Sequence, residues 1–74
     1  MKGFNYLVNS KVTQISVRFA KEQNIPVELA MEQFLISTTY QVLNEKDTGV
    51  YLEVVEFVYD MFLEEVGENA GNTD

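Results

Sequence analysis

Four carboxylates recur at intervals of three and four residues in the second half of the chain: Glu53, Glu56, Asp60 and Glu64. On a helix, at about 100° per residue, they fall within roughly 80° of one another. Their oxygens suit a hard divalent cation, their charge suits a basic partner protein, and runs of charge are also typical of a solvated helix face. A single helix rarely supplies enough ligands for a cation, so we predict no metal site.

The residue types that carry most enzymatic chemistry are missing. The chain has no histidine and no cysteine, so the commonest general base and the thiol nucleophile are absent. The three serines have no plausible activating base, and the four glycines are too scattered to form a phosphate-binding loop. The sequence therefore predicts a protein that is not an enzyme, with no catalytic residues and no cofactor.

The carboxylates belong to the longest helix-compatible segment without Gly or Pro in the second half of the chain, residues 51–66 (YLEVVEFVYDMFLEEV). Apolar side chains occupy most of the remaining circumference of this helix, interrupted by Glu65. A typical surface helix, by contrast, exposes about half of its circumference to water. This helix should therefore be the central one or be shared with a second chain. We predict that a partner binds to it through the acidic and aromatic side. The predicted partner-binding residues are Tyr51, Glu53, Glu56, Tyr59, Asp60, Leu63, Glu64 and Val66.

Three helices are predicted before it. Residues 2–23 carry apolar side chains at helical spacing, and the residue before Pro26 avoids the α region, which ends that helix. A second helix should run from about residue 27 to residue 37. Thr38 and Gln41 have the spacing of a capping box, so a short third helix should begin at Thr38 and stop near Asn44.

The rest of the chain is predicted to connect these helices or to be disordered. Residues 44–49 are expected to form a turn, and residues 50–52 to be extended before the last helix starts. The tail, residues 67–74, has nothing to bury and is expected to be a disordered acidic segment. Residues 1–66 then form a single all-α domain, a small bundle of three longer helices and one short helix.

Composition places this domain near the lower size limit for independent folding. With 74 residues, the domain should gain stability by oligomerisation, so we expect a homo-oligomer, a dimer. The amino terminus does not resemble a signal peptide, and no apolar run approaches the roughly 20 residues of a membrane span. We therefore expect a soluble, cytoplasmic protein without membrane contact.

Charge is distributed unevenly along the chain. The net charge is −7, and residues 45–74 carry nine acidic groups against Lys46 alone. Nucleic acid is an unfavourable partner for such a surface, because phosphate contacts need cations. Lys11, Arg18 and Lys21 lie on the polar side of the first helix and form a weak basic patch. These three cations are equally suited to pair with the acidic strip of the last helix, within the domain or across a dimer.

The block from residue 39 to residue 65 (TYQVLNEKDTGVYLEVVEFVYDMFLEE), with the preceding QNIPVELAMEQFL, resembles a group of small uncharacterised bacterial proteins. The resemblance covers residues 10–66. It points to a domain-of-unknown-function family encoded near ADP-ribosyltransferase-like toxins, and implies an antitoxin or accessory role without known catalytic residues. The chain departs from the group's pattern before the last helix, where Val54 or Val55 replaces a side-chain cap. The matching positions are Phe34, Ser37, Thr39, Tyr40, Leu43, Thr48, Gly49, Tyr51, Leu52, Tyr59 and Glu64.

Taken together, these features predict a protein-interaction module, antitoxin-like, that binds a basic partner protein through its last helix. A structural homodimer whose last helices pack together is the first alternative. A nucleic-acid-binding regulator that uses Lys11, Arg18 and Lys21 is the second.

Overall fold

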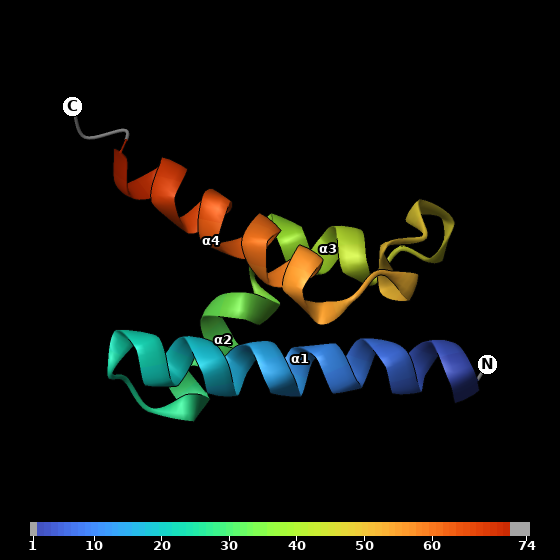
Figure 1. The fold of residues 1–74 in the computed structure, drawn as a ribbon, viewed down its shortest axis with the longest axis horizontal. Helices are drawn as coiled ribbons and strands as arrows, with labels where there is room; N and C mark the ends of the chain where they lie inside the picture. Colours follow the sequence, from blue (N-terminus) through green and yellow to red (C-terminus); the bar gives the residue numbers. More distant parts are fainter. Residues whose placement is uncertain (1, 72–74) are drawn as a thin grey trace.

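The computed structural model describes residues 2–71 and shows an elongated, all-helical domain of 41 × 24 × 18 Å (Figure 1). Its described part contains no strand, and the predicted bundle of three longer helices and one short helix is confirmed. Two short 3₁₀ helices connect the third helix to the last. The elements are α1 (Lys2–Gln23), α2 (Val27–Leu35), α3 (Thr38–Leu43), η1 (Lys46–Thr48), η2 (Val50–Leu52) and α4 (Val55–Gly71).

The turn between α1 and α2 is set by its sequence. Asn24 adopts the left-handed conformation, with φ 58°, which asparagine tolerates better than most residues. The Ile25 N–H then donates to the Ala20 carbonyl at 3.0 Å, which is the bond that closes a Schellman motif at a helix end. Pro26 follows as the N-cap of α2, so the chain reverses and α2 packs closely against α1.

Three phenylalanines hold the long helices together. Phe62 of α4 lies edge-to-face against Phe19 of α1, with ring centroids 4.9 Å apart, and against Phe34 of α2, 5.0 Å apart. Edge-to-face pairs add about 0.5–1.5 kcal/mol each beyond the burial of their area. From this centre α4 runs obliquely, so that its carboxyl end points away from α1 (Figure 1). The buried apolar residues are Val8, Val12, Ile15, Phe19, Ala20, Ala30, Phe34, Leu43, Val58, Tyr59 and Phe62.

Three stretches differ from the sequence prediction. α2 ends at Leu35 rather than near residue 37. Residues 50–52 are not extended but form η2, in which the Leu52 N–H donates to the Gly49 carbonyl at 3.0 Å. Gly49 makes this possible, because its φ of 74° ends η1 and starts η2. The backbone of residues 67–71 continues α4 as a helix. Extending an existing helix adds one hydrogen bond per residue without a new nucleation cost. Residues 72–74 of the predicted tail lie outside the described residues.

Ser16 is a polar residue in the middle of this core. It is fully buried, and its Oγ has no hydrogen-bond partner in the structure. Burial of an unpaired hydroxyl costs free energy, so we expect Ser16→Ala to raise the free energy of unfolding by about 1 kcal/mol. Urea denaturation followed by circular dichroism measures this change. Ser10→Ala, which removes an exposed hydroxyl bonded to Gln14, is the matched control and should change stability little; a less stable Ser16→Ala variant contradicts the prediction.

Candidate functional site

The four predicted carboxylates are all exposed, but they do not share one helix. Glu53 lies before α4, in an extended conformation with φ −76° and ψ 158°. Glu56, Asp60 and Glu64 lie on α4, where successive members are one turn apart. The acidic face of α4 therefore consists of three residues. Glu56 lies at the edge of this face that is nearest to α1.

Tyr51 also lies outside α4 and is held by the first helix. Its ring packs edge-to-face against Phe4, with centroids 4.8 Å apart. Its carbonyl accepts a hydrogen bond of 2.9 Å from Nζ of Lys11, a lysine that is buried. Because Tyr51 is not on α4, the helical spacing that would place it beside Tyr59 does not apply, and the two tyrosines form no common surface.

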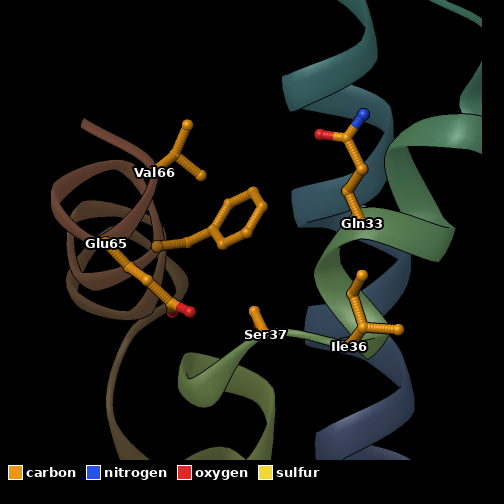
Figure 2. Close-up of a pocket in the computed structure, with 6 residues that line it drawn as sticks. Gln33, Ile36, Ser37, Glu65 and Val66 are labelled. Carbon is orange, nitrogen blue, oxygen red and sulfur yellow. The ribbon is translucent and has the colours of Figure 1, made fainter. Parts of the chain in front are cut away.

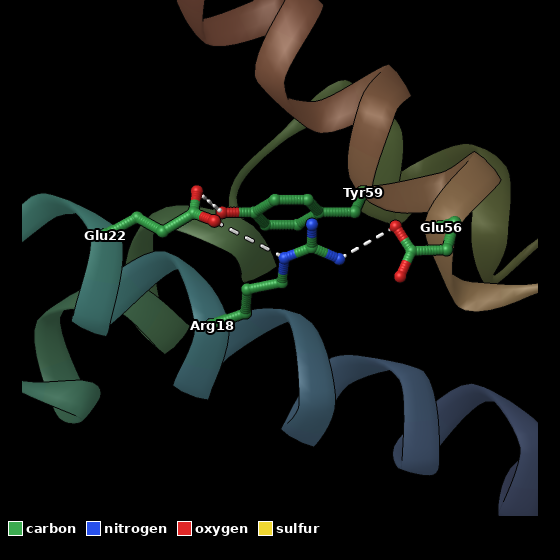
Figure 3. A network of polar contacts seen from close by, with 4 residues as sticks. All are labelled: Arg18, Glu22, Glu56 and Tyr59. Carbon is green, nitrogen blue, oxygen red and sulfur yellow. Dashed lines mark hydrogen bonds and ion pairs between the residues drawn. The ribbon is translucent and has the colours of Figure 1, made fainter.

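Tyr59 is a core residue, only 1% exposed. Its hydroxyl donates a hydrogen bond of 2.6 Å to Oε1 of Glu22, and the guanidinium of Arg18 lies 4.4 Å above its ring (Figure 3). Burial, and then the hydrogen bond to Glu22, raise the pKa of the Tyr59 hydroxyl. In this structure Tyr59 cannot contact a partner, so its assignment to the binding surface is wrong.

Arg18 links Tyr59 and Glu22 to the acidic face of α4. Its Nη1 lies 2.9 Å from Oε1 of Glu56, and its Nε lies 3.4 Å from Oε2 of Glu22 (Figure 3). The hydrogen bond to Glu56 is the largest influence on the pKa of Arg18, which is raised. The hydrogen bond from Tyr59 is the largest influence on the pKa of Glu22, which is lowered. Pairing between the cations of the first helix and the acidic strip is thus confirmed for Arg18.

Glu65 has a structural role that sequence reasoning missed. From α4 it reaches the amino end of α3, where its carboxylate accepts hydrogen bonds from the N–H groups of Thr38 (2.8 Å) and Thr39 (2.9 Å). It also accepts the hydroxyl hydrogen bond of Thr39, at 2.7 Å. Desolvation by burial raises the pKa of Glu65, but the hydrogen bonds from Thr39 and Thr38 outweigh it, and the pKa is lowered overall.

The N-cap of α3 is therefore Ser37, not Thr38. Its Oγ accepts the Tyr40 N–H at 3.0 Å, and its own N–H donates to the Phe34 carbonyl. Every N–H group that a helix leaves unpaired at its amino end has a partner here, from Ser37, Glu65 or Phe34. The helix begins at Thr38 and ends near Asn44, as predicted, but Thr38 and Gln41 form no capping box. The Ser37 hydroxyl and the carboxylate of Glu65, from another helix, cap it instead.

Leu63 and Val66, two of the predicted partner-binding residues, are half-buried. Val66 borders a groove of about 280 Å³ between the end of α2 and α4 (Figure 2). Ile36 stands at the edge of this groove and is 77% exposed. The groove is lined by Gln33, Ile36, Ser37, Phe62, Glu65 and Val66.

Exposed apolar side chains that the site prediction did not include lie at the start of α4. Val54, just before the helix, is 68% exposed, and Phe57 is 47% exposed; Met61, one turn after Phe57, is half-buried. Phe57 lies only about 20° around the helix axis from Glu64, seven residues later, and this spacing could have identified it. We call Val54, Phe57, Asp60, Met61 and Glu64 the outward strip of α4.

Asp60 and Glu64 differ from Glu56 in having no cation nearby. Among the side chains that the structure describes, the ion pairs join Arg18 to Glu22 and to Glu56, and none reaches the outward strip. Within the same part of the chain, no group of three or more acidic, histidine or cysteine side chains is placed to hold a metal ion.

None of the described helices combines the length and the apolar character that a membrane crossing requires. No family model, no curated protein and no solved structure matches the chain.

Proposed function

We propose that the protein is a non-enzymatic interaction module, antitoxin-like, that holds a second protein through the outward strip of α4. The observation that carries this proposal is the exposure of Phe57, 47% of whose surface faces solvent beside Asp60 and Glu64, two carboxylates without an ion pair among the described side chains. A single exposed apolar residue is ordinary. Here Met61, one turn further along α4, and the exposed Val54 just before the helix add apolar surface near Phe57, and contiguous apolar surface is typical of interaction sites.

The structure offers less support for a nucleic-acid regulator. Of the three cations in the predicted basic patch, Lys11 is buried against the Tyr51 carbonyl and Arg18 pairs with two glutamates. Only Lys21 remains exposed without such a contact among the described residues. Affinity for phosphate backbones grows with the number of cations that neutralise phosphates, so this surface is poorly suited to binding DNA or RNA.

The proposal is tested by comparing two alanine variants of equal exposure. Val17 on α1 is 46% exposed, so Val17→Ala is the control for Phe57→Ala. The tagged wild-type chain, expressed in the cells that encode it, should capture a protein that Val17→Ala retains and Phe57→Ala loses. The captured protein is then purified and titrated calorimetrically; truncation of a central aromatic contact should weaken binding at least tenfold. Equal affinity for both variants, or capture of no protein that binds the pure chain, refutes the proposal.

A further inference from the structure

The shape of the outward strip limits what can bind there. Phe57 and Met61 are one turn apart, and so are Asp60 and Glu64, so an apolar row and an acidic row run side by side along one helix. From Val54 to Glu64 the strip extends about 15 Å, or three helical turns. Two parallel rows of this length match the side chains of another helix, which projects apolar residues every three or four positions.

The charge of the strip indicates which charge the bound helix carries beside its apolar row. Asp60 and Glu64 are exposed and have no ion pair among the described side chains. Arg18, the cation that α1 places against the acidic face of α4, is already engaged by Glu22 and Glu56. The cations that would neutralise Asp60 and Glu64 must therefore come from the bound molecule.

From these two observations we infer that the outward strip binds an amphipathic helix of a partner protein that carries Lys or Arg along one side of its apolar row. The inference rests on the proposed function and specifies the partner's chemistry. Its apolar residues contact Val54, Phe57 and Met61, and its basic residues, one turn apart, face Asp60 and Glu64. Opposite charge across such an interface favours the correct register and speeds association at low salt.

A second copy of the chain fits the strip less well. In a two-fold symmetric dimer the same patch faces itself, which would place Asp60 and Glu64 of one copy near those of the other. Like charges across an interface are unfavourable. The net charge of −7 adds to this repulsion.

The test uses fluorescein-labelled peptides of leucine and lysine, followed by anisotropy. One peptide has leucines at helical spacing with lysines on one flank; a second has the same composition in strict alternation; a third replaces lysine by glutamate. The first should bind at least about tenfold more tightly than the other two, and its affinity should fall as salt rises. Equal binding of the first two peptides overturns the inference.

Matched charge variants locate the contact. Asp60→Asn with Glu64→Gln removes two charges from the strip, and Glu28→Gln with Glu32→Gln removes two exposed charges, also one turn apart, from α2. Only the first pair should weaken binding of the helical peptide and of the captured partner, by about tenfold or more. A partner that needs Phe57 but ignores Asp60, Glu64 and salt overturns this inference and leaves the proposed function standing. A dimer that sedimentation shows to dissociate in Phe57→Ala identifies a second copy as the occupant instead and also overturns it.

Discussion

Replacement of Phe62 by alanine is expected to lower the free energy of unfolding by about 3–5 kcal/mol. Phe62 is 1% exposed and is the ring through which α4 contacts both Phe19 and Phe34. Its truncation removes two edge-to-face pairs and leaves a cavity where three helices meet. For a chain of 74 residues, the whole stability is only roughly 4–11 kcal/mol, so this single change removes a large share of it.

Urea denaturation monitored by circular dichroism measures the loss. Phe57→Ala is the matched control, because it makes the same chemical change on the same helix at a side chain that is half exposed; it should cost less than about 1 kcal/mol. Should Phe62→Ala be too unstable to show a transition, Phe62→Leu keeps most of the volume and gives a measurable intermediate loss. Equal stability of the Phe62 and Phe57 alanine variants would show that Phe62 is not at the centre of the core.

Replacement of Glu65 by glutamine is expected to cost about 1–3 kcal/mol. Its carboxylate accepts three hydrogen bonds from Thr38 and Thr39, and a glutamine in its place presents an NH₂ group that cannot accept them. At least one N–H group of α3 then loses its partner. Glu64→Gln is the control, because Glu64 is the neighbouring, exposed carboxylate of the same helix; it should be almost neutral.

The same contact predicts how stability depends on pH. The pKa of Glu65 in the folded protein lies below its ordinary value of 4.5, so on acidification the unfolded chain takes up the proton first. The contribution of Glu65 is therefore complete above about pH 5 and is lost as the pH falls through the folded pKa. Glu22, whose pKa is also lowered, contributes in the same direction. Wild type should lose more stability than Glu65→Gln between pH 6 and pH 3; parallel curves would contradict the assignment.

Local signals in the sequence were sufficient for the first part of the fold. The spacing of apolar residues and Pro26 predicted α1, α2 and the turn between them, because the Asn24 and Pro26 preferences act over only a few residues. The acidic face of α4 followed from spacing in the same way. All of these features depend on neighbours along the chain.

The features that the sequence did not predict are contacts between distant segments. Glu65 lies 26 residues from Thr39, and Tyr59 lies 37 residues from Glu22. The packing of α1 against α4 buries Tyr59, whose hydroxyl reaches Glu22. The exposure of Phe57 could have been inferred from its place beside Glu64 on the helix, but the prediction did not use that spacing. For this reason the last helix was predicted as an element, together with its exposed Asp60 and Glu64, whereas the exposure of Phe57 was not.

The dependence of α3 on Glu65 has a consequence for folding. A helix of six residues is far too short to persist alone in water, and two of the N–H groups at its amino end are satisfied only by a carboxylate of α4. α3 thus has no folded state of its own and becomes ordered when α4 docks. We expect the local pair α1–α2 to form first and the second half of the chain to join it in one cooperative step.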